Sequence, residues 1–148
     1  MPEEPTTPDL AQGAREAFAA ATAEDLEGTT ASLAPDAVWE MDEVGLGPFE
    51  GMDAIRAFLR EWWSLWEEHH HYVEEAVDLG NDVGYVIVRE DGRMKGSDTV
   101  VEARVAHVIE AINGQVARDT TYTCVDEARA VAGRLAESRK EGMSQGGS

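Results

Sequence analysis

Two titratable side chains, His107 and Asp119, lie on either side of the pair Asn113-Gly114. An Asn-Gly pair between two extended runs is a strong signal for a β-hairpin, so we expect the two residues on neighbouring strands. Histidine changes charge near neutral pH, and a nearby carboxylate stabilises its cation. If the two side chains face the same side of the hairpin, they form a unit that can transfer protons.

The geometry of the turn decides whether His107 and Asp119 share a face. A three-residue type I turn followed by a bulge would place them directly opposite each other on one face. A two-residue type I′ turn would shift the register by one residue and send them to opposite faces. The residues alone leave both turns open. An inward pair would in turn be either catalytic or a cross-strand ion pair in a partly wet cavity.

The acids Glu40 and Asp42 alternate with Trp39 and Met41. In a strand this alternation sends the two sets to opposite faces. We expect Trp39 and Met41 to face inward and the acids to face solvent. The alternative places Asp42 at the mouth of a pocket.

The run His69-His70-His71 has the residue type of a metal site but lacks its spacing. Consecutive residues project in different directions, and neither a cysteine nor a carboxylate at ligand spacing completes a closed set. We therefore expect a solvated junction between a helix and a strand, and no metal. Cys124 is expected to be a small buried hydrophobic residue rather than a nucleophile, and no cofactor motif is found.

The elements that must position these side chains follow from apolar periodicity and from turn residues. Residues 1–8 are expected to form a flexible arm, residues 9–137 one domain, and residues 138–148 a disordered tail. The expected elements are helices from Asp9, from Glu24 to before Pro35, from Met52 through Trp66 and from Asp126 through Leu135, strands at 38–41, 72–79, 83–89, 100–112 and 116–125, and a glycine-rich loop at 45–51. This order predicts an α+β fold in which a curved, mostly antiparallel sheet wraps around the N-terminal helices as a cone with one open end.

The composition bounds the function classes. The net charge of −18 repels phosphate backbones and anionic lipid surfaces, so we expect neither nucleic-acid nor membrane binding. The single cysteine excludes an intramolecular disulfide and fits a reducing compartment. The first residues lack the basic and apolar regions of a signal peptide. We therefore expect a cytoplasmic protein.

Several segments resemble the nuclear transport factor 2-like superfamily and, within it, the SnoaL-like group named for polyketide cyclases. The resemblance covers roughly residues 10 to 135 and implies the cone fold predicted above. The matching segments are Asp25-Leu26-Glu27, Leu33-Ala34-Pro35-Asp36-Ala37-Val38-Trp39-Glu40, Gly47-Pro48-Phe49-Glu50-Gly51, Ala54-Ile55-Arg56-Ala57-Phe58-Leu59, Ala106-His107-Val108 and Ile112-Asn113-Gly114-Gln115-Val116.

The resemblance also implies site positions. The general-base aspartate of ketosteroid isomerases falls on or beside Met41, with Asp42 usable only if an extra loop residue is absorbed after it. Their oxyanion-hole tyrosine falls near Phe18, which has no hydroxyl. The inward acid of limonene-epoxide-hydrolase-like relatives falls on Thr121. The acid/base aspartate of SnoaL-like cyclases has its nearest match in Asp119, and the resemblance favours the turn that faces Asp119 and His107 inward.

We therefore expect a small-molecule enzyme without a cofactor, of the cyclase or isomerase type rather than an epoxide hydrolase, that acts on a hydrophobic carbonyl compound. Asp119 would be the general acid or base, and His107 would assist it. The pocket is expected to be lined by Phe18, Trp39, Met41, Leu59, Trp63, Tyr85, Ile109 and Thr121.

The alternative is a non-catalytic ligand-binding or dimerisation module of the same fold. In that case a strand face with Ala103, Ala106 and Val108 would pair with a second copy of the chain as a homodimer.

Overall fold

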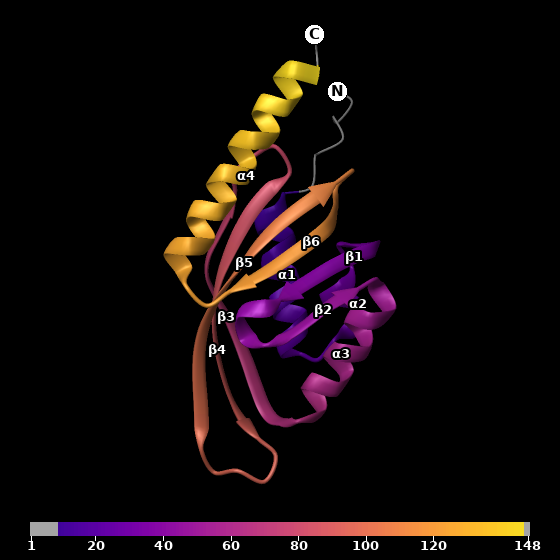
Figure 1. Cartoon of the computed structure of the whole chain (residues 1–148). Helices are drawn as coiled ribbons and strands as arrows, with labels where there is room; N and C mark the ends of the chain where they lie inside the picture. The colour runs from indigo at the N-terminus through magenta and orange to yellow at the C-terminus, as the bar shows by residue number, and fades with distance from the viewer. Residues whose placement is uncertain (1–8, 147–148) are drawn as a thin grey trace, which may run out of the picture.

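The structure is a computed structural model that describes residues 9–146 (Figure 1). The expected flexible arm at residues 1–8, and residues 147–148 of the expected tail, lie outside the described residues. No helix in the described part of the chain is long and apolar enough to cross a membrane.

The predicted α+β class is confirmed, with four α-helices and six strands in the described residues. The helices are α1 (Leu10–Thr22), α2 (Leu26–Thr30), α3 (Met52–Ser64) and α4 (Val125–Gly146), with a short 3₁₀ turn η1 (Asp42–Val44). The strands are β1 (Leu33–Met41), β2 (Leu46–Glu50), β3 (Trp66–Asp78), β4 (Val83–Met94), β5 (Val100–Ile112) and β6 (Gln115–Tyr122).

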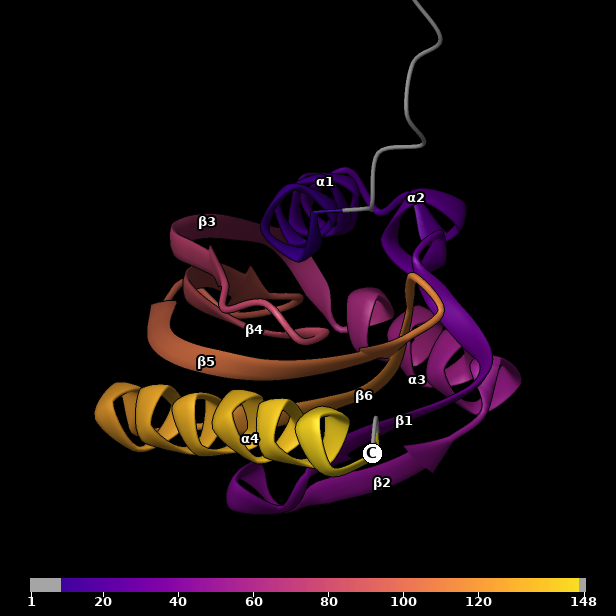
Figure 2. The same cartoon turned by 90° about the horizontal axis from the view of Figure 1, so that it is seen from above.

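All six strands form one curved sheet in the order β2-β1-β6-β5-β4-β3. Neighbouring strands are antiparallel except β1 and β6, which are parallel. Figure 2 shows the sheet bending around a space that α1, α2 and α3 approach from the concave side, while α4 covers the convex side. The expected cone is therefore the observed architecture.

Local sequence explains where the first helices begin. The Asp9 side chain accepts a hydrogen bond from the backbone N–H of Ala11, and that of Asp25 accepts one from Gly28. Such caps satisfy backbone donors that have no partner inside the helix. Both helices form where they were expected. However, α2 ends at Thr30 rather than just before Pro35, because β1 already begins at Leu33.

Among the other boundaries that differ from the prediction, those of β2 and β3 differ because tertiary pairing overrides a local signal. The expected loop at 45–51 contains β2, an edge strand on β1, where Pro48 is tolerated because one side of the strand has no partner. Strand β3 begins at Trp66 instead of residue 72, because its first residues pair with the long β4. Helix α4 continues past Leu135, so residues 138–146, expected to be disordered, are helical.

One group of buried side chains lies between the convex side of the sheet and α4. On the convex side, Ile87, Ala106 and Val108 pack against Ala128 and Ala132 of α4, and all five are almost fully buried. The strand face expected to pair with a second copy is thus covered by a helix of the same chain. Alternation along β5 places Ala103 on the opposite face from Ala106, at the internal cavity.

Two glycines give a matched test of this packing. A Cβ on Gly84 would lie 2.7 Å from the carbonyl oxygen of Val77 in β3, whereas a Cβ on Gly133 of α4 would meet nothing within 4 Å. We expect Gly84→Ala to lower the free energy of unfolding by about 1–3 kcal/mol through overpacking. Gly133→Ala should raise it by about 0.5–1 kcal/mol, because alanine favours helix. Urea unfolding measures both, and equal effects would contradict the close approach of β3 and β4.

Candidate functional site

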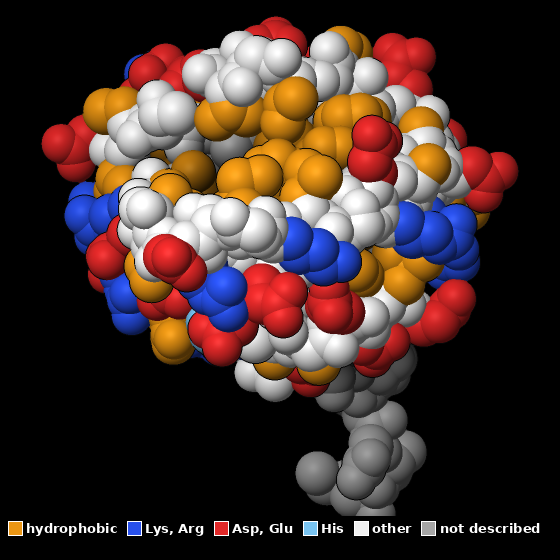
Figure 3. Space-filling model, turned by 90° about the horizontal axis from the view of Figure 1, so that it is seen from below, with side chains coloured by type: hydrophobic (Ala, Val, Ile, Leu, Met, Phe, Trp, Pro, Cys, Tyr) orange, Lys and Arg blue, Asp and Glu red, His pale blue; other side chains and the backbone are white. Residues whose placement is uncertain are grey.

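The concave side of the sheet encloses a cavity of about 370 Å³. Its walls are mostly apolar and come from α1, α3 and the strands β1, β5 and β6. Most of the residues expected to shape a pocket do line it, namely Phe18, Trp39, Met41, Leu59, Trp63, Ile109 and Thr121. Seen from below, hydrophobic side chains gather at the centre of the face and charged side chains surround them (Figure 3).

Tyr85 is the exception, and its expected place in the pocket is wrong. Along β4 the residues that face the convex side include Val83, Tyr85 and Ile87, and Tyr85 packs against the cluster under α4. Its hydroxyl donates to Glu75 at 3.0 Å. The alternation that puts Tyr85 outside puts Glu90 inside, so β4 contributes a carboxylate to the cavity where a hydroxyl was expected.

The hairpin between β5 and β6 combines parts of both predicted turns. Asn113 and Gly114 have φ values of 53° and 81°, and Ile112 pairs with Gln115, which defines the two-residue type I′ turn. The three-residue turn favoured by the resemblance is therefore wrong. The register then shifts next to Glu110, with Ala117 as the extra residue of a bulge.

The bulge restores the common face that a type I′ turn alone would remove. His107 pairs with Thr121, and Asp119 pairs with Ile109, so His107 and Asp119 are diagonal rather than direct neighbours. Both line the cavity. Their Nδ1 and Oδ1 atoms are 2.9 Å apart, a charge-assisted hydrogen-bond distance when the histidine is protonated.

Aromatic and polar contacts hold the His107 ring in place. The side chain is 5% exposed, against 24% for Asp119. The Phe18 ring packs 5.1 Å from the imidazole, between ring centroids. Thr121 Oγ1 lies 3.4 Å from His107 Nδ1 and accepts a hydrogen bond from Trp39 Nε1 at 2.9 Å. With Nδ1 held in this way, Nε2 is the ring nitrogen left for a ligand.

The environment raises the pKa of His107 above the ordinary value of 6.5. Burial acts in the opposite direction because it disfavours the charged ring. The Asp119 carboxylate outweighs burial through its charge and its hydrogen bond, and the charge of Glu90 adds to this. The pair therefore holds a proton more firmly than an isolated buried histidine would.

Thr121 gives a test of the polar contacts behind the pair. Replacing it with valine keeps the shape but leaves the Trp39 indole N–H without an acceptor, which costs about 1–3 kcal/mol. Thr120, the next residue of β6, points to the other face and is the matched control. We expect denaturant unfolding to show a clear loss for Thr121→Val and a much smaller one for Thr120→Val. Equal losses would contradict the Trp39–Thr121 hydrogen bond.

The predicted positions of Glu40 and Asp42 are confirmed, whereas that of Cys124 is wrong. Glu40 receives a hydrogen bond from Arg118, Asp42 is exposed, and neither lines the cavity, as expected. Cys124 is exposed, so its predicted burial is wrong.

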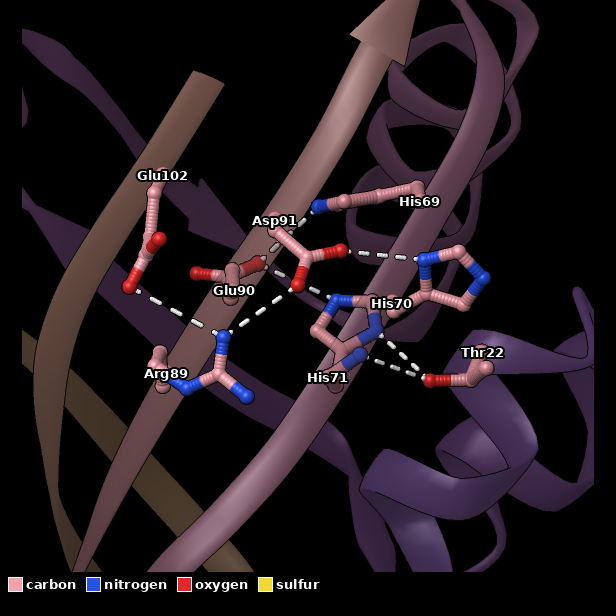
Figure 4. Close-up of polar contacts among 8 residues, drawn as sticks. All are labelled: Thr22, His69, His70, His71, Arg89, Glu90, Asp91 and Glu102. Carbon is pink, nitrogen blue, oxygen red and sulfur yellow. Dashed lines mark hydrogen bonds and ion pairs between the residues drawn. The ribbon is translucent and has the colours of Figure 1, made fainter. Parts of the chain in front are cut away.

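The solvated junction predicted for the histidine run is also wrong. His69 and His71 lie in β3 with side chains 10% and 6% exposed, and both point to Glu90 of β4, while His70 points the other way to Asp91 (Figure 4). Burial opposes ionisation of Glu90, but hydrogen bonds from the two imidazoles outweigh it and lower the Glu90 pKa to about 2. Once the run is read as a strand, alternation alone predicts that His69 and His71 share a face.

The fold is that of nuclear transport factor 2-like proteins. A protein of this fold and of unknown function from Burkholderia pseudomallei superposes with a TM-score of 0.67 and 24% identity, over 82% of this chain and 95% of that chain. An LEH-like epoxide hydrolase from Mycobacterium tuberculosis superposes with a TM-score of 0.65 and 18% identity, over 84% of this chain and 90% of that chain. A protein assigned as a SnoaL-like polyketide cyclase from Jannaschia superposes with a TM-score of 0.67 and 16% identity, over 88% of this chain and 96% of that chain.

Residues 14–119 match the SnoaL-like domain family, so the chain belongs to the SnoaL-like family. No curated protein matches the chain. Proteins of this fold include cyclases, isomerases and epoxide hydrolases, and identities below 25% establish the fold alone.

Proposed function

We propose that this protein is an enzyme that moves a proton on a small hydrophobic carbonyl compound held in the cavity. The observation that supports this most is the His107–Asp119 hydrogen bond of 2.9 Å at the wall of an apolar cavity of about 370 Å³. A cavity of this size and lining suits a drug-sized apolar molecule. A base that faces such a cavity works without competition from bulk water.

The proposed step begins when His107 Nε2 accepts a proton from the carbon next to the carbonyl. The C–H electron pair moves into the bond between the two carbons, and the carbonyl π electrons move to oxygen, which gives an enolate. The imidazolium then returns its proton to the enolate at the same or another carbon. Asp119 stabilises the imidazolium through Nδ1 in the interval. The step uses only groups of this chain.

This assignment exchanges the roles expected from the sequence, where Asp119 was the acid or base and His107 its assistant. The Oδ1 oxygen of Asp119 is occupied by its contact with His107 Nδ1, whereas Nε2 of the same ring is left for a ligand. The raised pKa of His107 makes the imidazole a stronger base than an ordinary histidine. Asp119 is therefore proposed as the residue that orients the His107 ring and stabilises its protonated form.

Deuterium exchange tests this proposal without knowledge of the natural substrate. The chain is incubated in D₂O with a panel of aromatic bicyclic ketones such as β-tetralone, and proton NMR follows the signal of the carbon next to the carbonyl. We expect the chain to accelerate loss of this signal above the buffer rate. A ketone that binds in the cavity but exchanges only at the buffer rate would overturn the enzymatic proposal.

A non-catalytic binding module is the second candidate function. The apolar lining of the cavity favours it equally, and the exchange experiment separates the two. The expected homodimer stays a prediction, and light scattering across a dilution series tests it. A dimer would need another surface than Ala106 and Val108, because α4 already covers these strand residues. The cytoplasmic location, and the absence of nucleic-acid and membrane partners, likewise stay predictions from charge and cysteine content.

A further inference from the structure

Three partly buried side chains outside the His107–Asp119 pair converge on one point. His69 and His71 are two residues apart on β3, so both project to the same face, and Glu90 is the β4 partner of His71. The Nε2 atoms of His69 and His71 lie 3.2 Å and 3.1 Å from the same oxygen, Glu90 Oε1. The three ligand atoms all lie within 4.8 Å of one another (Figure 4).

These distances fit the coordination shell of a transition metal. Zinc binds imidazole nitrogen at about 2.0–2.1 Å and carboxylate oxygen at about 2.0–2.2 Å, so neighbouring ligands of a tetrahedral ion lie about 3.3 Å apart. The two measured separations from Glu90 Oε1 are close to that length. Two imidazoles and one carboxylate are a recurrent three-residue set that leaves a coordination position open.

The surroundings of His71 resemble the outer shell of a metal ligand. Its Nδ1 lies 3.1 Å from the Thr22 hydroxyl oxygen, and that oxygen also accepts the backbone N–H of His71 at 2.9 Å. When Nδ1 donates its proton to Thr22, the lone pair of Nε2 is free for a metal. The His69 ring is held instead by stacking on Trp66, with ring centroids 4.5 Å apart.

The cluster is also reachable by an ion and by a ligand. Glu90 and His71 line the main cavity, while Glu90 and His69 line a smaller neighbouring hollow of about 220 Å³. The open coordination position of a bound ion is therefore available from these hollows. The net charge of −18 raises the local concentration of cations.

We propose that His69, His71 and Glu90 bind one divalent transition-metal ion of the zinc or cobalt type. The site shares no residue with the His107–Asp119 pair, although both line the main cavity, and it does not depend on the function proposed above. It also replaces the expectation, drawn from sequence, that the histidine run binds no metal.

Metal titration of the untagged full chain, freed of metal by a chelator, tests the site. Addition of CoCl₂ should produce the visible absorption of a four- or five-coordinate ion at one equivalent, and ZnCl₂ should displace it. His69→Ala and His71→Ala should each weaken binding by at least about 100-fold, because even outer-shell changes cost 10- to 100-fold. His70→Ala is the matched control, because that ring points to Asp91, and its affinity should be unchanged.

Thermal unfolding supplies a second measurement. Zinc should raise the Tm of the wild-type chain and of His70→Ala, since a ligand that binds only the folded state stabilises it. Glu90→Gln, which keeps the size of the side chain and removes its charge, should lose this increase. Absence of the cobalt spectrum in the wild-type chain, or an equal loss of affinity in His70→Ala, would overturn the proposal.

Discussion

The Asp119→Asn chain should deuterate a cavity-bound ketone about 10²–10⁴-fold more slowly than the wild-type chain, because a histidine base that loses its orienting carboxylate loses up to about 10⁴-fold in rate. Asparagine keeps the shape of the side chain but removes the charge that stabilises the His107 imidazolium. His107→Gln should lose at least as much, because it removes the proton acceptor itself. The initial rate of exchange in D₂O, measured by NMR at saturating ketone, gives the comparison.

The pH dependence of the same reaction distinguishes the roles of the two residues. The proton acceptor must be neutral in the free enzyme, so kcat/KM should rise with pH through the pKa of His107, which lies above 6.5. In Asp119→Asn the burial that lowers the histidine pKa is no longer opposed by the neighbouring carboxylate. The midpoint should therefore move to lower pH. If His107→Gln kept most of the activity, Asp119 would be the base, as the sequence suggested.

A surface acid provides the control for these variants. Glu40 is bound by Arg118 and does not line the cavity. Glu40→Gln should leave both the exchange rate and its pH midpoint unchanged. An equal shift in this variant would mean that net charge, rather than the His107–Asp119 pair, sets the pH dependence.

The largest effect on stability is expected from Ile87→Ala. Ile87 is 0% exposed in the cluster between the sheet and α4, so its truncation leaves a cavity and lowers the free energy of unfolding by about 2–5 kcal/mol. Ile112, at the tip of the β5–β6 hairpin, is 59% exposed and is the matched control, with an expected change within about 0.5 kcal/mol. Urea unfolding measures the free energy of unfolding of both variants, and the m-values should stay the same as in the wild-type chain.

This pair of variants also tests the position of α4. Ile87 is fully buried only if α4 covers the convex face of the sheet, where Ala128 and Ala132 contact it. A loss below about 1 kcal/mol for Ile87→Ala would contradict that arrangement. It would leave the convex face open to a second copy of the chain.

The sequence predicted the class of the fold and most of the cavity lining, because both depend on periodicity. The apolar spacing of α3 and the alternation of Trp39 and Met41 are local patterns, and the order of the elements predicted the cone that the resemblance also implies. Tyr85 was misplaced because β4 is buried on both faces near its start, so its apolar run does not show which face is inward.

The site depended on features that no local pattern contains. The Ala117 bulge decides that His107 and Asp119 share a face, and nothing in the sequence around it predicts an extra residue. The convergence of His69 and His71 on Glu90 requires β3 to begin six residues earlier than expected, at Trp66 instead of residue 72. That boundary follows from pairing with β4, a contact between distant segments.

An NMR pH titration of the His107 imidazole measures the state of the His107–Asp119 pair most directly. In the wild-type chain we expect its ring C–H signals to titrate above the ordinary value of 6.5, and to move when β-tetralone fills the cavity. In Asp119→Asn the midpoint should fall below the wild-type value. A His107 midpoint that is the same in both chains and insensitive to the ketone would contradict a proton-transfer pair that faces a ligand cavity.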